Sequence, residues 1–411
     1  MTFSSSPQTH WKTPAMVLLC GTLILLCSFG IRQTYGLFLA PISEANGWNI
    51  AIFSVSMGLQ VLIWGISQPI WGMIADKFGA GRVVSMGAVL YAVGLYMMAH
   101  SSTVLEIHFS TGFLTGIAMS ATGFPIILAV IGRSVDTKRR SLYLGIASAG
   151  GSSGQVIIVP FAHHFMLDGG HVSALITLSA LMILIIPLTL AVAGKPPRPE
   201  DQLGPDLSVR EAILEALRHK GYVLLVIGFF VCGFQTLFIA SHLPLYLKDV
   251  GISPNVAAWA LASIGLFNIF GSIMWGALGG RFSKKYMLAS LYMMRSAGII
   301  IYMIVPTTAL TTIIFASFMG LTWLGTIPLT SGLVAQIFGT QYMAMLYGFA
   351  FMSHQVGSFI GITLGGLVRD FSGSYDLIWW SAVGLGFVAA LIHWPIDENP
   401  VDRIKVHLSA S

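Results

Sequence analysis

Long apolar runs separated by short polar clusters make up almost the whole chain. Dividing the sequence at its charged, proline and glycine clusters leaves twelve segments, each close to the roughly 20 apolar residues that a helix needs to cross a bilayer. Continuous runs of this length are typical of helices and not of the alternating strands of a barrel. The pattern therefore predicts an all-α membrane protein with twelve transmembrane helices. The predicted spans lie near 14–40, 49–75, 83–99, 104–132, 141–166, 172–193, 221–248, 255–280, 286–305, 309–337, 342–369 and 375–396.

Charge is scarce in this chain and unevenly placed. Of the 411 residues, 55% are hydrophobic and 9% are charged, against about 25% charged in soluble domains. With the N-terminus inside, 17 of the 21 lysine and arginine residues fall in cytoplasmic segments, and only Lys248 and Arg369 fall outside. By the positive-inside rule, we expect both termini in the cytoplasm and a multi-pass protein of the bacterial inner membrane. The excess of basic over acidic residues then reflects the orientation of the chain in the membrane, and no nucleic-acid partner is predicted.

The two halves of the chain repeat each other. An offset of 204 residues places Trp71, Gly72 and Tyr143 on Trp275, Gly276 and Tyr347. Because each half holds six predicted spans, both copies cross the membrane in the same sense and are related by an axis along the membrane normal. We predict two parallel-related six-helix bundles, residues 1–193 and 221–411, with a cleft between them.

The segment 194–220 is the predicted cytoplasmic linker between the bundles. It begins with the proline-rich stretch GKPPRPEDQLGPD and continues as SVREAILEALRHK, which has helical periodicity. Ser208 stands three residues before Glu211, a pair typical of the capping box at a helix N-terminus. A surface helix is expected here, and a regulatory role is the alternative.

The stretch GMIADKFGAGR (72–82) resembles the loop signature between spans two and three of the major facilitator superfamily. The resemblance implies the major facilitator fold and a gating role for this loop. Gly72 would permit close helix approach, and Asp76 would accept hydrogen bonds at a neighbouring helix N-terminus. Lys77 and Arg82 would supply charge pairs at the cytoplasmic face. In the second half Gly280 replaces the aspartate, so weaker gating contacts are expected there.

Four further stretches (30–42, 238–247, 324–339 and 353–380) resemble bacterial members of the monocarboxylate transporter-like branch, which includes oxalate/formate antiporter relatives. The resemblance implies transport of small carboxylates by alternating access. Better-known members carry a substrate-binding arginine in span eight, and the oxalate exchanger has a lysine in span eleven. Here span eight has no basic residue, and Arg369 lies only at the outer end of span eleven.

Arg32 is the candidate that replaces this missing anion site. It lies inside the first apolar run, where a charge costs at least about 2.5–3.5 kcal/mol, and it is about 12 Å from the predicted external end. Tyr35 shares its helix face, and a guanidinium fork suits a carboxylate. The alternative is a structural arginine paired with helix carbonyls or another partner. Arg295 in span nine is expected to fill a polar seam between helices, with a second substrate or coupling charge as its alternative.

Other polar residues are candidate substrate contacts. Gln235 is the repeat counterpart of Arg32 at an offset of 203, and His242 shares its helix face. His242 and His354 are the titratable candidates for carrying a proton, and a structural hydrogen bond is the alternative for each. Asn268 lies within span eight, where it either binds substrate or bonds to another helix.

These features predict a secondary active transporter of a small organic anion, monocarboxylate-type, working by proton symport or anion exchange. The alternative is a multidrug or other small-metabolite efflux carrier of the same fold. Acids are missing from mid-span positions, which argues against cationic drugs, and no nucleotide loop supports ATP-driven transport. His163 and His164 beside Asp168 lack metal-ligand spacing, so neither an enzyme nor a cofactor is predicted. The expected partners are a small carboxylate, protons or a counter-anion, and the bilayer, around a monomeric protein.

Overall fold

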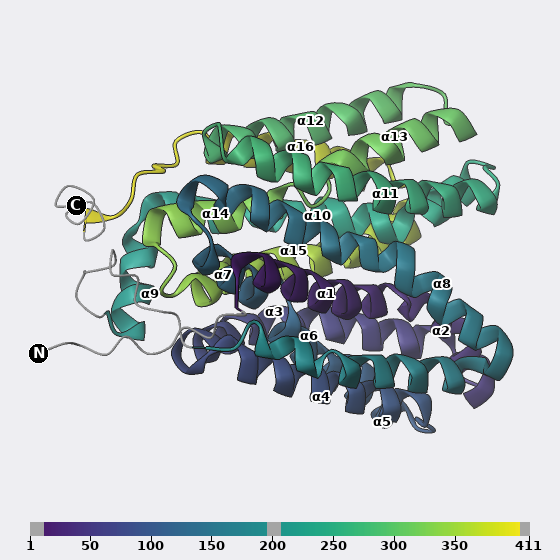
Figure 1. Cartoon of the computed structure of the whole chain (residues 1–411). Coiled ribbons are helices and arrows are strands. Elements are labelled where there is room, and N and C mark those ends of the chain that lie inside the picture. The colour runs from purple at the N-terminus through teal and green to yellow at the C-terminus, as the bar shows by residue number, and fades with distance from the viewer. Residues whose placement is uncertain (1–11, 195–206, 403–411) are drawn as a thin grey trace, which may run out of the picture.

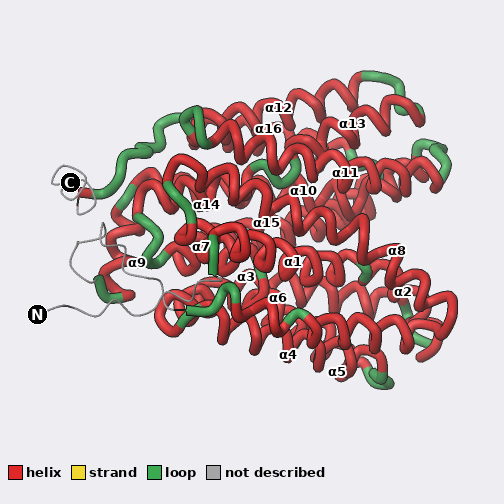
Figure 2. Tube along the Cα trace, in the orientation of Figure 1, coloured by secondary structure: helices red, strands yellow, loops and turns green. Residues whose placement is uncertain are grey.

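The computed structural model describes residues 12–194 and 207–402, and every regular element in those residues is a helix (Figures 1 and 2). The first half contains α1 (Pro14–Gln33), α2 (Tyr35–Asn46), α3 (Ile50–Phe78), α4 (Ala80–Ala99), α5 (Val104–Ile107), the π-helix η1 (His108–Leu114), α6 (Thr115–Thr122), α7 (Phe124–Ser134), α8 (Thr137–Leu184) and the 3-10 helix η2 (Ile186–Leu190). The second half contains α10 (Lys220–Asp249), α11 (Pro254–Gly279), α12 (Lys284–Ile304), α13 (Ala309–Thr322), α14 (Thr326–Phe338), α15 (Met343–Ser372) and α16 (Asp376–His393). Helix α9 (Val209–Arg218) lies between the halves in sequence.

The helices account for the twelve predicted crossings. Among the described residues, ten helical runs are long and apolar enough to cross a membrane. One of them, Thr137–Leu190, makes two crossings because its backbone turns at Gly169 and Gly170. Gly170 has a φ of 71°, which glycine adopts without steric cost. The 29-residue helix α3 supplies the remaining crossing.

Three spans that the sequence predicts as continuous are interrupted. The first divides at Thr34, whose hydroxyl donates to the Ile31 carbonyl at 2.7 Å, a local bond that competes with the helix ladder. The fourth divides at Gly123 and the tenth between Thr322 and Thr326. Pro125 and Pro328 follow these last two breaks, and a proline ring clashes with the carbonyl four residues before it. Each of these three predicted spans is therefore built from more than one helix.

The linker helix α9 forms as predicted. Ser208 Oγ accepts from the Glu211 amide at 3.2 Å, and Glu211 Oε2 accepts from the Ser208 amide at 2.7 Å. The Ser208 amide also holds the pKa of the Glu211 carboxyl below its ordinary value. The first part of the predicted linker, 195–206, lies outside the described residues. We call the end of the molecule that carries α9 the linker end, and the opposite end, with the Gly169–Gly170 turn, the distal end (Figure 1).

The most extensive contacts between the halves are those of α3 along α15 and of α8 along α11. Repeat-related glycines sit at these contacts. A Cβ added at Gly72 would lie 2.5 Å from the Ala344 carbonyl oxygen, and one at Gly276 would lie 2.7 Å from Gly145 Cα. Both clashes are with backbone, so neither can be relieved by a side-chain rotation. Gly72 therefore permits the close helix approach that the loop signature implies.

We expect Gly72→Ala and Gly276→Ala each to force the halves apart and to lower thermal stability, by an amount on the order of 1–3 kcal/mol for overpacking. Gly58→Ala on α3 is the matched control, because a Cβ there meets nothing within 4 Å and alanine favours the helix. Thermal unfolding of the purified variants measures the difference. Equal melting temperatures for Gly72→Ala and Gly58→Ala would contradict the tight contact.

Candidate functional site

Aromatic side chains meet where the two halves touch near the middle of the helices. Phe29 on α1 lies 5.4 Å from Trp64 on α3 and 4.1 Å from Phe124 on α7, measured between ring centroids. Trp64 in turn lies 5.1 Å from Phe351 on α15, which belongs to the other half. We call these four residues the aromatic floor. The floor thus links α1, α3 and α7 of the first half to α15 of the second half.

Arg32 stands one turn beyond the floor, toward the distal end. At 100° per residue, Phe29, Arg32, Gln33 and Gly36 lie on one face of α1 and α2. Arg32 is partly exposed, and Gln33 and Gly36 are exposed. Phe29 on this face belongs to the floor, where it contacts Trp64 and Phe124 of the same half. Gln33 was not singled out from the sequence, although its polarity within an apolar run was a visible signal.

The Arg32 guanidinium is unusual in having no fixed protein partner. Neither a hydrogen-bond acceptor nor a carboxylate lies within bonding distance of it among the residues that the structure describes. The phenol groups of Tyr35 and Tyr91 lie near it. Arg32 lies in the last turn of α1, where the negative end of the helix dipole favours a cation. The charge is thus tolerated by local dipoles and remains available to an anion.

Tyr35 begins α2, three residues after Arg32, and is fully buried. Its hydroxyl lies beside Thr115, Tyr91 and Gln60. The Gln60 amide donates to Thr115 Oγ1 at 2.8 Å. Gln60, Tyr91 and Thr115 were missed by the sequence analysis, since each is a single polar residue in an apolar run and only packing shows that they face one cluster.

His354 lies against the floor from the other half and is 7% exposed. Its ring stacks on Phe351 at 5.4 Å between centroids and packs on Phe229 at 4.9 Å. Nδ1 lies 3.0 Å from Gln355 Oε1, and the ring interacts with the Cys232 thiol. The structure therefore places His354 between the floor residue Phe351 and Phe229 of α10.

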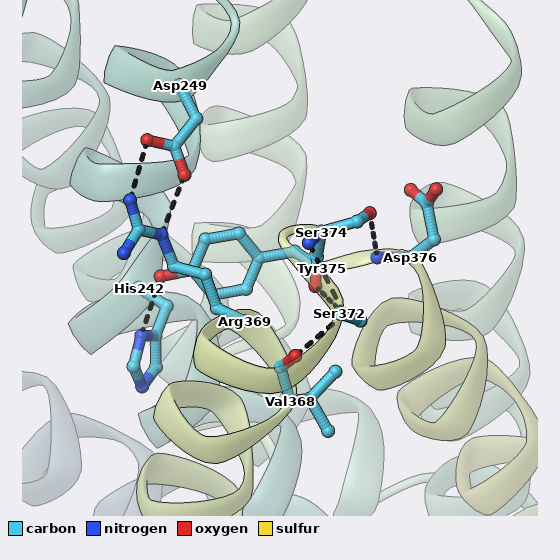
Figure 3. A network of polar contacts seen from close by, with 8 residues as sticks. All are labelled: His242, Asp249, Val368, Arg369, Ser372, Ser374, Tyr375 and Asp376. Atoms are coloured by element: carbon cyan, nitrogen blue, oxygen red, sulfur yellow. Dashed lines mark hydrogen bonds and ion pairs between the residues drawn. The ribbon is translucent and has the colours of Figure 1, made fainter.

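Gln235 and His242 are used within the second half. Gln235 Nε2 donates to the Ala382 carbonyl of α16 at 2.9 Å. His242 Nδ1 lies 3.1 Å from the Tyr375 hydroxyl (Figure 3). Its Nε2 lies 2.8 Å from the Ile362 carbonyl. A carbonyl only accepts, so Nε2 carries the proton and Nδ1 accepts from the phenol. These two candidates do not join Arg32 and Tyr35 in one cluster.

Above His242, the distal ends of α10 and α15 are held by an ion pair (Figure 3). Arg369 Nε and Nη2 donate to the two carboxylate oxygens of Asp249 at 2.8 and 3.0 Å. This is the bidentate geometry that matches guanidinium to carboxylate. Arg369 therefore ties two helices of the same half together, consistent with its absence from the predicted anion site.

Asn268 lies on the boundary between the halves. Its Nδ2 donates to Ser152 Oγ on α8 at 2.9 Å, and its Oδ1 accepts from the Leu324 amide at 2.9 Å. Ser272 Oγ is a second donor to Oδ1, at 3.4 Å. Asn268 is thus held by protein groups in the state described.

Arg295 is completely buried and fills a seam between helices, as the sequence suggested. Its Nε donates to the Thr322 carbonyl at 3.1 Å, and Nη1 lies 3.3 Å from Cys232 Sγ. Nη2 donates to the carbonyls of Thr322 and Trp323. Arg32 and Arg295 therefore differ: the Arg295 guanidinium is bonded by two backbone carbonyls and a thiol, and the Arg32 guanidinium has no such partner among the described residues.

The loop-signature residues gather at the linker end. Asp76 Oδ2 accepts from the Met345 amide at 2.9 Å, in the first turn of α15. Its other oxygen pairs with Arg133 at 2.8 Å, and this arginine was not predicted. Lys77 lies over the Phe78 ring, and Arg82 is exposed. Asp76 thus joins α3 and α7 to the opposite half.

Comparisons with known proteins agree with this fold. A model described as the Major Facilitator Superfamily matches residues 21–253 and again 225–409. The MFS-type transporter YcxA of Bacillus subtilis is 25% identical over 91% of this chain and 92% of its own length. The oxalate:formate antiporter of Oxalobacter formigenes is 22% identical over 89% and 88%, and monocarboxylate transporter 13 of Bos taurus is 23% identical over 94% and 91%. Among solved structures, FucP in the outward conformation has a TM-score of 0.72 at 17% identity and covers 92% of this chain and 98% of its own. The proton:xylose symporter XylE has a TM-score of 0.71 at 15% identity, covering 96% and 98%.

Proposed function

The chain belongs to the Major Facilitator Superfamily, and the Arg32 guanidinium has no acceptor within bonding distance among the described residues. On these grounds we propose that the protein is a secondary active transporter of a small organic anion and that Arg32 faces the route between its halves. The cargo is a monocarboxylate-type molecule, and Arg32 is its anchor. We place the protein in the bacterial inner membrane with both termini in the cytoplasm, as the positive-inside rule predicts.

The free state of Arg32 is the observation that carries this proposal. A guanidinium at membrane depth is costly unless it is paired or wet, and Arg32 is partly exposed without an acceptor among the described residues. A carboxylate supplies two oxygens for its two parallel donors. The oxalate:formate antiporter and the monocarboxylate transporter among the relatives support an anionic cargo.

The proposed cycle uses the aromatic floor as a barrier between the two sides of the membrane. The anion enters from the distal end and binds Arg32 above the floor. The halves then rock about the floor, so that the contacts at the linker end open and those at the distal end close. Asp76 and Arg133 are part of the contact that must break in this step.

Two coupling modes remain in the proposal. In symport, a titratable group near the route takes up a proton with the anion, and His354 is better placed for this than His242, which is held by Tyr375 and Ile362. In exchange, a second anion takes the place of the first at Arg32 and no proton site is required. Proteoliposomes distinguish them: uptake driven by a pH gradient alone indicates symport, and uptake that requires an internal anion indicates exchange.

The first test is ligand-dependent stability of the purified protein. A ligand that binds only the folded state stabilises it by about 2.7 kcal/mol at 100 times its Kd. We expect one or more small monocarboxylates to raise the melting temperature, and size-matched neutral amides to leave it unchanged. Stabilisation by amphipathic drugs alone would favour the efflux alternative and contradict the carboxylate assignment.

A further inference from the structure

The break in span ten leaves backbone polar groups without helix partners at membrane depth. Between α13 and α14 the chain is not helical, and unpaired C=O and N–H groups are costly where water is absent. Trp275 Nε1 donates to the Leu321 carbonyl at 2.9 Å. The Arg295 guanidinium takes the next two carbonyls, those of Thr322 and Trp323. The shape of the break is therefore held by side chains from α11 and α12.

Asn268 completes this arrangement and extends it across the molecule. Its Oδ1 accepts from the Leu324 amide, the first backbone group after those carbonyls. The other end of the Asn268 carboxamide, Nδ2, donates to Ser152 Oγ on α8. A single buried side chain thus bonds both to the break in span ten and to the opposite half.

The first half contains a related arrangement at its own break. Span four divides at Gly123, and Gln68 Nε2 donates to the Ser120 carbonyl at 2.9 Å. Trp64 Nε1 donates to Gln68 Oε1 at 3.1 Å, and Trp64 contacts Phe351 of the other half. At an offset of 204, Trp64 corresponds to Asn268. In both halves, then, the same repeat position lies between a broken span and the opposite bundle.

We propose that Asn268 is a positioning residue that couples the break in span ten to the packing of α8 against α11, and that it acts in this way and not by binding cargo. When the halves separate along α8 and α11, the hydrogen bond from Asn268 Nδ2 to Ser152 breaks. The Asn268 side chain is then less firmly held where its Oδ1 accepts from the Leu324 amide. Separation of the halves and loosening of the break are linked because one side-chain carboxamide, that of Asn268, makes both hydrogen bonds. Trp64 provides the apolar counterpart in the first half.

The test measures how readily α8 separates from α11. Ser141 on α8 is buried at the linker end of this contact, and a Cβ at Gly279 of α11 would lie 2.8 Å from its hydroxyl. A cysteine introduced as Ser141→Cys therefore reports separation through its rate of maleimide labelling. The protein without this substitution gives the background, which we expect to be low because Cys20, Cys27 and Cys232 are all buried.

Ser152→Ala removes the cross-half bond and keeps the Leu324 contact. A net hydrogen bond of about 1 kcal/mol corresponds to about a fivefold rise in the labelling rate. Asn268→Leu should raise the rate at least as much, and the double variant should not exceed Asn268→Leu alone, because both changes remove the same bond. Ser148→Ala is the matched control, since Ser148 is a buried α8 serine bonded to Leu144 of its own helix.

Labelling of Ser152→Ala at the wild-type rate, or an equal rise in Ser148→Ala, would overturn the proposal. Strictly additive effects in the double variant would overturn it as well. Ser152→Ala alone decides the matter if Asn268→Leu fails to fold. The measurement uses no substrate, so it stands or falls independently of the carboxylate assignment.

Discussion

Replacing Arg32 with glutamine should abolish uptake of the carboxylate cargo while the protein remains folded and inserted. The substitution removes both charge-assisted donors, each worth about 1.5–3 kcal/mol, so binding should weaken by at least about 100-fold. Folding should survive because Arg32 has no hydrogen-bond partner to orphan among the described residues. Uptake of the stabilising carboxylate into proteoliposomes, together with the melting temperature, measures both parts.

Two variants sharpen the Arg32 result. Arg32→Lys keeps the charge but loses the planar fork, so partial binding with weaker affinity is expected. Arg139→Gln is the matched control, because Arg139 is an exposed arginine at the linker end and its loss should leave uptake unchanged. Full uptake by Arg32→Gln would remove the basis of the anion site. A large fall in the melting temperature together with the loss of uptake would instead assign Arg32 a structural role.

Asp76→Ala should have the second large effect, on stability and on transport together. The carboxylate is completely buried, and the Arg133 side chain is only 7% exposed. Removing one partner of a buried ion pair costs about 3–5 kcal/mol, because the other charge is left uncompensated. The Met345 amide loses its acceptor at the same time. We expect a clearly lower melting temperature and at least a tenfold fall in uptake, an order-of-magnitude estimate from that cost.

The partner variants separate the charge from the hydrogen bond. Asp76→Asn keeps an acceptor for the Met345 amide and should fall between wild type and Asp76→Ala. Adding Arg133→Leu to Asp76→Ala should recover part of the stability, because no unpaired charge remains. Asp136→Ala is the control, since Asp136 is exposed at the same end. A melting temperature for Asp76→Ala equal to that of Asp136→Ala would contradict the contribution of this contact.

Much of the architecture could be predicted from the sequence because the bilayer imposes a simple length rule. The apolar runs gave twelve crossings, and the offset of 204 residues placed Gly72 and Gly276 at equivalent helix contacts. The capping box at Ser208 was also readable, since its two bonds are made within four residues. In each case the information is local or periodic, so no knowledge of distant contacts is required.

The candidate site could be predicted only in part, because its contacts join residues that are distant in the sequence. Arg32 and Tyr35 share a helix face and were found together, but Gln60, Tyr91 and Thr115 come from three other helices. Arg133 was missed beside Asp76, although both are charged, because 57 residues separate them. A polar residue in an apolar run indicates that its side chain needs a hydrogen-bond partner, but the sequence does not show which residue provides it.

The sequence by itself determined the number of membrane crossings, their repeat relationship and the presence of two intramembrane arginines. Only the tertiary structure decided which arginine is free, because the Arg295 guanidinium is satisfied by carbonyls released at a break in a different span, 27 residues away. It also decided that Asn268 faces the opposite half, since Ser152 lies 116 residues from it in the chain. Hydrogen-bond satisfaction in a dry interior is a property of the packed helices and not of any one of them.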